Sequence, residues 1–278
     1  KKLHRALYFK QSFEKTMFTK IENEMKKCEE SHIVVVGAGL SGVEIVAEIA
    51  HFSAKFFKSG QFACDNLRIS LISGSKDILP GMNKTIIQMS RKRLQDLGIN
   101  IISGTHMSSC DDRYIYLSNG DALPYSFIIF AGGIEAANLT SKFDLPKNRK
   151  GQILVNEYLQ VADADGVFAA GDVCVINDKE GNQMPSNVTV ARESGKIAAQ
   201  NILNLINNKP MRECKPFIKG TLIALGGKYA VCNLYNKINL KGFIGYLIKQ
   251  YVFYRYKIPL QQISRNGYKK LKNKHFLW

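Results

Sequence analysis

The stretch HIVVVGAGLSGVEIVAEIA, residues 32–50, constrains the fold more than any other part of the chain. Its short run of β-branched residues is typical of a buried strand, and the residues after the glycines have the spacing of a helix. Between them, Gly37, Gly39 and Gly42 form an unbroken GxGxxG. In a dinucleotide-binding unit these glycines permit the tight turn, the approach of a pyrophosphate and close packing of helix on strand, respectively.

The first residues of the following helix are expected to complete this phosphate site. Backbone N–H groups at a helix N-terminus lack intrahelical acceptors and carry a partial positive charge. We therefore place Leu40 and Ser41 in the same cofactor-binding set as the three glycines. The alternative is a glycine turn needed only for packing.

The segments that follow predict an α/β fold. Apolar strands are expected at residues 67–74 and 99–107, with a helix between them from about residue 83 to residue 97, where Gly98 would end it. This β-α-β-α-β order is typical of a Rossmann-like, doubly wound parallel sheet. A further strand in FIIFAGG ends at Gly132 and Gly133, which we expect to line the nucleotide cleft.

The residue that usually binds the adenosine ribose is missing. An Asp or Glu commonly ends the second strand of such a unit, but here Ser73 takes that place and Asp65 precedes the strand. Ser73, Ser75 and Lys76 could instead receive a 2′-phosphate. The choice between NADH and NADPH therefore stays open at this stage.

A second strand-like segment, GVFAAGDVC, ends in Gly171 and Asp172. A flavin site needs such a pair, because the Asp accepts a hydrogen bond from a ribitol hydroxyl and the Gly lets the chain pass close to the isoalloxazine. A surface turn closed by an Asp is the alternative. Glu44 also has two interpretations: a carboxylate favoured by the helix dipole, or a catalytic group facing the nicotinamide and flavin.

The positive charge of the chain is concentrated at its C-terminal end. The formal net charge is +16, and residues 214–278 contain thirteen Lys or Arg and no Asp or Glu. We expect a hairpin over residues 218–235 and then two basic, aromatic amphipathic helices that part near Pro259. Such helices are typical of a membrane interface. A dimer helix and a nucleic-acid surface are the alternatives, and we favour docking on an anionic membrane with no nucleic-acid partner.

Four motifs together resemble one family. VVVGAGLSGVEIVAEIA, FIIFAGGI, GVFAAGDV and KGTLIALGGKYAVCNL occur in the order seen in type II NADH:quinone oxidoreductases. The resemblance covers nearly the whole chain and implies FAD and NAD as cofactors, with hydride transfer from NADH to FAD and electrons passed to a membrane quinone. It also implies a peripheral enzyme on the cytoplasmic face of the inner (plasma) membrane, with a homodimer as a further option.

The chain departs from that family in its FAD-binding half. The family begins with its own FAD-binding GxGxxG, whereas the only GxGxxG here begins at Gly37. We therefore expect a leading helix (1–30), an NAD(P)H-binding domain (31–136), the C-terminal part of an FAD-binding domain (137–213) and the basic segment (214–278). Such a fragment should bind flavin poorly and be inactive alone.

The sequence indicates the electron donor more directly than the electron acceptor. Val188 and Thr189 open the helix expected near the flavin, but Thr189 and Glu193 replace glutamines of the family pattern. Two alternatives therefore stay open: an NADPH-dependent flavoprotein reductase of a soluble acceptor, and a nucleotide-binding, membrane-associated module without turnover. The six cysteines form no CxxC and are expected to be mostly buried apolar residues, with no metal site.

Overall fold

The computed structural model describes residues 31–57 and 67–273, together with the helical residues Leu7, Tyr8, Gln11 and Lys15. The chain forms two compact units. Unit 1 comprises Lys1–Gly132 and Thr221–Trp278, and unit 2 comprises Gly133–Gly220. Apart from those four residues, the helix expected over residues 1–30 lies outside the described residues.

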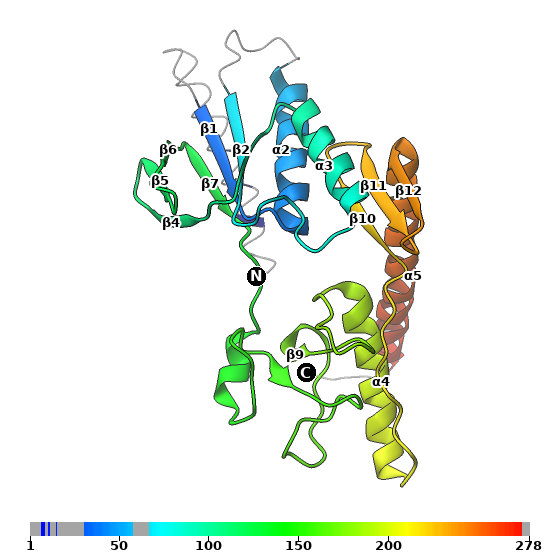
Figure 1. Cartoon of the computed structure of the whole chain (residues 1–278). Helices are drawn as coiled ribbons and strands as arrows, with labels where there is room; N and C mark the ends of the chain where they lie inside the picture. Colours follow the sequence, from blue (N-terminus) through cyan, green and yellow to red (C-terminus); the bar gives the residue numbers. More distant parts are fainter. Residues whose placement is uncertain (1–6, 9–10, 12–14, 16–30, 58–66, 274–278) are drawn as a thin grey trace. The chain divides into compact units, whose positions relative to one another are not determined.

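Unit 1 is built on a four-stranded parallel sheet with the order β3-β2-β1-β7. Two helices alternate with the first three strands along the chain, and Figure 1 labels β1, α2, β2 and α3. The elements are β1 (Ser31–Val36), α2 (Leu40–Phe57), β2 (Leu67–Ser73), α3 (Lys84–Asp96), β3 (Asn100–Ser103) and β7 (Phe127–Phe130). The predicted Rossmann-like α/β fold is therefore confirmed. Helix α3 begins after Asn83, whose side chain accepts a hydrogen bond from Thr85 N, and Gly98 follows its end with φ +75°.

Alternate residues of β1 face two different apolar layers, as the two-residue period of a strand requires. Ile33 and Val35 belong to the core beneath α2 and α3, whereas Val34 and Val36 pack with Ile115 on the other face. That second face is covered by the antiparallel strands β4 (Met107–Cys110), β5 (Tyr114–Leu117) and β6 (Ala122–Pro124). The sheet is thus buried on both sides, which explains the continuous apolar run in its sequence.

The C-terminal segment returns to unit 1. It consists of β10 (Gly220–Ala224), β11 (Ala230–Leu234), β12 (Ile238–Gly242) and α5 (Phe243–Asn273). The predicted hairpin is confirmed, but the sequence did not reveal the third strand β12. The prediction of two helices is wrong, because α5 runs without interruption through Pro259. A proline removes one backbone hydrogen bond and can kink a helix without ending it, and the prediction overrated that effect.

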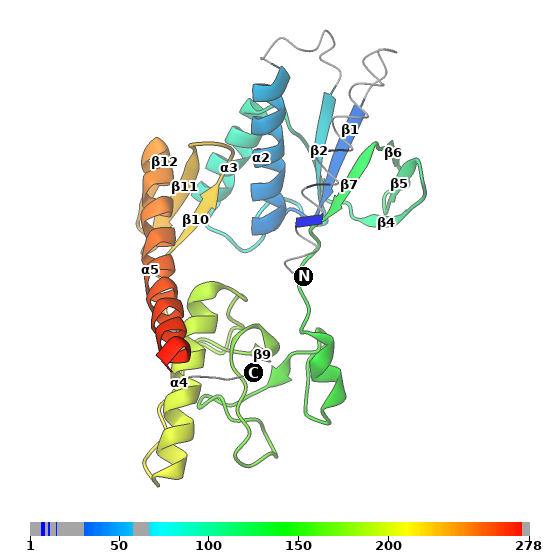
Figure 2. The same cartoon turned by 180° about the vertical axis from the view of Figure 1, so that it is seen from behind.

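This segment packs on the helices of the nucleotide-binding fold. Ile223, Leu225 and Val231 belong to the same core as α2 and α3, and α5 lies along β11 and β12 (Figure 2). The hairpin turn rests on α2, where Gly227 N donates to Glu48 Oε2 at 3.1 Å. The sequence places domain boundaries near residues 136 and 213, and the two compact units divide after Gly132 and Gly220.

Unit 2 is smaller and has little regular structure besides one helix. It contains η1 (Asn138–Lys142), β8 (Ile153–Leu154), η2 (Gly171–Val173), β9 (Cys174–Val175) and α4 (Val188–Ile206). Helix α4 matches its prediction closely. The strand expected in GVFAAGDVC is wrong, because among the described residues Phe168 makes only an isolated bridge to Gln160 and β9 pairs with β8 over two residues. A parallel strand needs neighbours to accept and donate its backbone hydrogen bonds, and this segment has few.

Candidate dinucleotide-binding site

Two of the three motif glycines allow close contact between backbones. Gly37 has φ +105°, and a Cβ at this position would lie 2.6 Å from the carbonyl oxygen of Ala131. A Cβ at Gly42 would overlap the carbonyl oxygen of Gly37. A side chain at either position would therefore separate β1 from β7 or α2 from the turn, as the sequence predicted for a tight turn and a closely packed helix.

Gly39 differs from its neighbours because its missing side chain faces open space. No heavy atom lies within 4 Å of the place where its Cβ would be, and its φ is not positive. The packing of this protein therefore gives no reason for glycine at this position. The first turn of α2 begins at the next residue and contains no acidic side chain, and both Leu40 and Ser41 are exposed. Open main chain at a helix N-terminus without a competing carboxylate suits an anion.

The end of β7 lies beside this turn. β7 pairs with β1 in parallel, and Ala131 N donates to Val36 O at 2.7 Å. The strand order reverses between β1 and β7, and ligands of doubly wound sheets bind at such a switch point. Gly132 follows directly, and a Cβ there would lie 2.5 Å from the exposed ring of Phe130. Gly133 has φ +120° with open space around its Cβ position.

Ser73, the residue expected near the ribose, is buried. Only 2% of it is exposed, and its hydroxyl donates to the carbonyl oxygen of Asp77 at 2.9 Å. The hydroxyl thus closes the loop after β2. Among the other candidates, Ser75 is half-buried and Lys76 is exposed.

Asp77 and Arg91 form an ion pair beside this loop that sequence reasoning missed. Arg91 donates to Asp77 Oδ1 through Nη2 at 2.5 Å and Nε at 3.1 Å, and the same oxygen accepts from Ile78 N at 2.8 Å. The hydrogen bond from Arg91 is the main reason that the pKa of Asp77 is lowered from its ordinary value. Fourteen residues separate the two groups, and no pattern in the sequence pairs them.

Glu44 binds the C-terminal segment. It is the fifth residue of α2 and lies beyond the first turn, so the helix dipole does not account for it. Its Oε1 accepts a hydrogen bond from Ala224 N at 2.9 Å and forms an ion pair with Lys249 of α5. About a third of each side chain is exposed, 35% for Glu44 and 29% for Lys249. These contacts span up to 205 residues, and no local sequence pattern indicates them.

In unit 2, the structure brings Gly171 and Asp172 next to helix α4. Gly171 has φ +76°, and its N–H donates to Ser194 Oγ at 3.0 Å. Ser194 is fully buried and donates in turn to Val190 O at 2.7 Å, an arrangement that sequence reasoning missed. The Asp172 side chain is exposed, and its carbonyl oxygen accepts a hydrogen bond from Gln152.

The N-terminus of α4 is capped by Asn187, whose side chain accepts a hydrogen bond from Val190 N at 3.0 Å. Val188 is exposed, Thr189 is half-buried, and the first turn contains no acidic residue. The predicted flavin residues Gly171, Asp172, Val188 and Thr189 therefore belong to two segments that Ser194 joins by hydrogen bonds.

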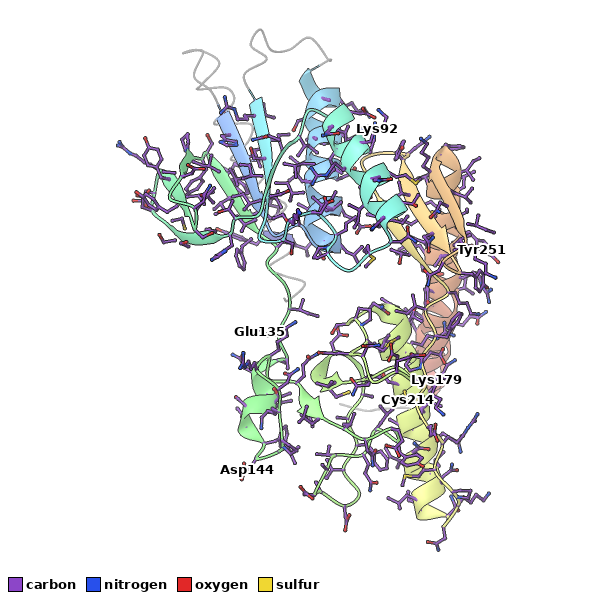
Figure 3. All side chains as sticks on the ribbon, viewed as in Figure 1. Lys92, Glu135, Asp144, Lys179, Cys214 and Tyr251 are labelled. Atoms are coloured by element: carbon purple, nitrogen blue, oxygen red, sulfur yellow. The ribbon has the colours of Figure 1, made fainter. Side chains whose placement is uncertain are left out.

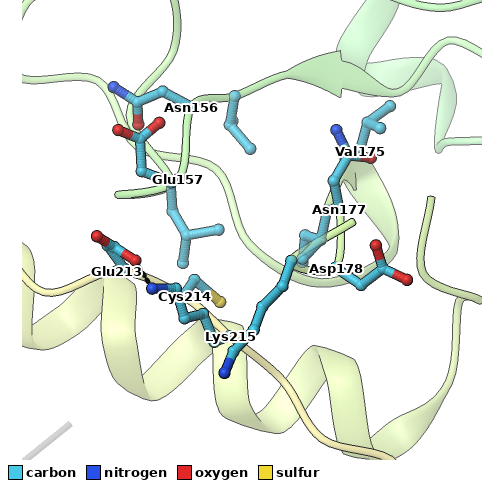
Figure 4. A pocket seen from close by; sticks show the side chains of 12 residues that line it. Asn156, Glu157, Val175, Asn177, Asp178, Glu213, Cys214 and Lys215 are labelled. Carbon is cyan, nitrogen blue, oxygen red and sulfur yellow. Dashed lines mark ion pairs between the residues drawn. The ribbon is translucent and has the colours of Figure 1, made fainter. Parts of the chain in front are cut away.

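Unit 2 also contains a cavity of about 560 Å³, shown in Figure 4. Glu213 and Lys215 form an ion pair at one side of it, and Asp178 lies at another. The Asp178 carboxylate accepts hydrogen bonds from Glu180 N and Asn182 N within its own turn. These polar groups are thus engaged with each other or with the backbone, and the cavity contains none of the predicted site residues.

Three cysteines are buried, as expected for small apolar residues. Burial raises the pKa of the Cys174 thiol to about 12 and the pKa values of the Cys214 and Cys232 thiols to about 11. As the pH rises, these thiols ionise in the unfolded chain before they ionise in the folded one. They therefore do not change the free energy of unfolding below the ordinary pKa of 9.0, and they lower it as the pH rises towards 12. Cys110 is exposed. The other two cysteines lie outside the described residues.

The chain is similar to known proteins over most of its length. Residues 8–195 match the family model described as pyridine nucleotide-disulphide oxidoreductase. A type II NADH:quinone oxidoreductase of Haemophilus influenzae is 29% identical over 209 residues, which are 74% of this chain and 47% of that protein. The mitochondrial internal alternative NAD(P)H-ubiquinone oxidoreductase A1 of Arabidopsis thaliana is 26% identical over 246 residues, which are 82% of this chain and 47% of that protein.

A solved structure shares the fold. The structure of NDH2 from Plasmodium falciparum in complex with NADH matches with a TM-score of 0.72 and 19% identity, covering 92% of this chain and 69% of that one. The chain spans about half the length of the curated relatives it matches.

Proposed function

Because the chain belongs to the pyridine nucleotide-disulphide oxidoreductase family, we propose that it supplies the NADH-binding part of a type II NADH:quinone oxidoreductase. In the whole protein, NADH would give a hydride to FAD, and the electrons would pass to a membrane quinone. The proposal also assigns unit 2 to the flavin side of the enzyme. The names of the curated relatives, which include NADH and quinone, support it.

The open position at Gly39 carries this proposal. Gly37 and Gly42 are explained by contacts within the protein, whereas Gly39 borders empty space at the start of α2. A pyrophosphate can approach the main chain there and accept hydrogen bonds from the N–H groups of Leu40 and Ser41. Gly132 and Gly133, at the switch point of the sheet, would line the path of the nicotinamide half.

The residues of unit 2 fit one end of FAD. The exposed carboxylate of Asp172 can accept a hydrogen bond from a ribitol hydroxyl, and Gly171 provides the positive φ of the turn that precedes it. Val188 and Thr189 would offer helix N-terminal N–H groups to the same molecule. When bound, FAD would supply the hydride acceptor that protein side chains lack. The chain has no second GxGxxG for the pyrophosphate of FAD, so we propose weak flavin binding.

Glu44 is proposed to act at the reacting end of the nucleotide site, as the family resemblance implies. The hydrogen bond from Ala224 N and the ion pair with Lys249 hold its carboxylate in place. Glu44 thereby also fixes α5 to the helix that follows the glycine turn. A change in the charge of this carboxylate would therefore alter the contact between α2 and α5.

Helix α5 is proposed to dock on an anionic membrane surface. Phe243, Leu247, Tyr251 and Tyr254 recur at helical spacing and are all more than half exposed, and Tyr251 points outward in Figure 3. Ile248 and Val252 are half-buried on a neighbouring face. No helix within the described residues is long and apolar enough to cross a membrane. An aromatic face with interspersed lysines and arginines suits the interface of a bilayer, and we propose the cytoplasmic face of the inner (plasma) membrane. The same face could serve a homodimer.

Calorimetric titration of the chain with NADH tests the nucleotide site. We expect binding by the wild type and strongly weakened binding by Gly39→Ala. The matched control is Gly195→Ala, which also has open space at its Cβ position but lies in α4. If the wild-type chain binds no nicotinamide coenzyme, the proposal fails.

Turnover is tested separately with added FAD and a soluble quinone, by following the loss of NADH absorbance. Binding without oxidation would favour the second candidate, a nucleotide-binding, membrane-associated module without activity of its own. For this chain by itself, the exposed apolar face of α5 is the observation that favours the second candidate.

A further inference from the structure

The loop after β2 is held directly against the glycine turn. Leu79 N donates to Ala38 O at 2.8 Å, which ties the end of this loop to the GxGxxG backbone. On its other side, Gly104 N donates to Ser75 O at 3.0 Å, which ties the loop to the residue after β3. In a doubly wound sheet, residues in this position face the adenosine ribose of a dinucleotide. The groups that residues 74–77 present therefore decide what may be attached to the 2′-oxygen.

The carboxylate that this loop carries, Asp77, lies beyond the end of β2 and is paired with a guanidinium. Ser73 replaces the usual acidic residue, and its hydroxyl donates inward to Asp77 O. The side chain of Asp77 is 46% exposed, but Oδ1 accepts three hydrogen bonds, two from Arg91 and one from Ile78 N. The end of β2 thus lacks the acidic residue that favours NADH, and the ion pair with Arg91 offsets the negative charge of Asp77, which would otherwise repel a 2′-phosphate.

Two side chains that can donate hydrogen bonds to a phosphate lie at the same place, and one of them is a lysine. Lys76 is exposed on the loop. His106 is also exposed, and its Cβ lies 3.5 Å from the place where a Cβ of Gly74 would be, so it stands beside the loop. The side chain of Arg91 is 32% exposed and offsets the charge of Asp77. The balance of charges around residues 74–77 is therefore positive.

We propose that the adenosine end of the nucleotide site accepts the 2′-phosphate of NADPH, with Lys76 and His106 as the phosphate-binding groups. The chain then binds NADPH at least as tightly as NADH. This inference rests on the proposed binding of a nicotinamide coenzyme at the glycine turn. It extends that proposal to the class of coenzyme, since charge-assisted contacts to a phosphate dianion are stronger than neutral hydrogen bonds.

The test measures the dissociation constants of NADPH and NADH by calorimetry, together with adenosine 2′,5′-bisphosphate and 5′-AMP as probes of the adenosine end. For the wild type we expect NADPH to bind no more weakly than NADH, and the bisphosphate to bind more tightly than 5′-AMP. Lys76→Glu should weaken NADPH binding about tenfold while leaving NADH binding within about twofold, because only the 2′-phosphate contact is reversed in sign.

Two further variants keep the result interpretable. Lys92→Glu, an exposed lysine on α3 (Figure 3), is the matched charge reversal and should change neither affinity. His106→Gln should weaken NADPH binding and leave NADH binding unchanged. Tighter binding of NADH than of NADPH would overturn this inference and leave the proposed function standing. Failure of the wild type to bind either coenzyme would overturn both.

Discussion

Replacing Gly39 and Gly42 by alanine should have opposite effects on stability and ligand binding. The two positions lie three residues apart in one motif, and each substitution adds one methyl group. At Gly39 the methyl group meets no protein atom within 4 Å, whereas at Gly42 it overlaps the carbonyl oxygen of Gly37. Gly39→Ala should therefore damage the ligand site alone, and Gly42→Ala should damage the fold.

The structure sets the expected magnitudes. Gly39 does not have a positive φ, so alanine there should change the free energy of unfolding by no more than about 1 kcal/mol, and the change could be stabilising. A methyl group that displaces the pyrophosphate removes charge-assisted hydrogen bonds worth roughly 1.5–3 kcal/mol, or about ten- to a hundredfold in affinity. Gly42→Ala forces α2 away from the turn, and such overpacking costs about 3 kcal/mol or more.

The assays are thermal denaturation and calorimetric titration with NADH on the same preparations. Gly42→Ala should lower Tm by roughly 6–12 °C, taking about 2–4 °C per kcal/mol for a chain of this size. Gly39→Ala should keep the wild-type Tm and lose affinity. A folded Gly39→Ala protein that binds NADH as tightly as the wild type would refute the assignment of this open position to the pyrophosphate.

Three further outcomes are expected. Glu44→Gln should lower the free energy of unfolding by about 1 kcal/mol, since the partly exposed ion pair with Lys249 is lost while an acceptor for the backbone N–H remains; unchanged melting in both Glu44→Gln and Lys249→Met would contradict this. Tyr251→Glu should reduce co-sedimentation with vesicles containing anionic lipid about tenfold, whereas Ile206→Glu, also more than half exposed but on α4, should have no effect. Iodoacetamide at pH 8 should label Cys110 in the folded chain and reach the three buried thiols only on unfolding, as peptide mass mapping would show.

The parts of the fold that depend on near neighbours in sequence were predictable. The strand before Gly37, the helix after it and the ends of α3 and α4 follow from hydrophobic period, glycine position and capping residues, and all are found near the expected residues. The roles of Gly37 and Gly42 were predictable for the same reason, because a tight turn and close helix packing are local demands.

Contacts between distant parts of the chain were not predictable. The pairing of Glu44 with Lys249 depends on how the C-terminal strands lie on α2, and no repeat or spacing in the sequence encodes that placement. The sequence did not predict the burial of Ser73, because a serine at the end of a strand can either face solvent or donate a hydrogen bond within the loop that follows. The prediction of a strand near Phe168 was wrong because an apolar run indicates only that the segment is buried. A strand also needs neighbouring segments that pair with its backbone N–H and C=O groups.

The arrangement of unit 1 explains why nucleotide binding and flavin binding should separate in this chain. Every residue assigned to the phosphate and ribose end lies in unit 1, where apolar cores cover both faces of the parallel sheet. Ile223, Leu225 and Val231 complete one of these layers from a distant part of the sequence, so the nucleotide site needs this C-terminal segment although it contributes no phosphate contact. The flavin-side residues lie in unit 2, whose paired strands β8 and β9 are two residues long. Coenzyme binding should therefore survive at conditions in which FAD is not retained.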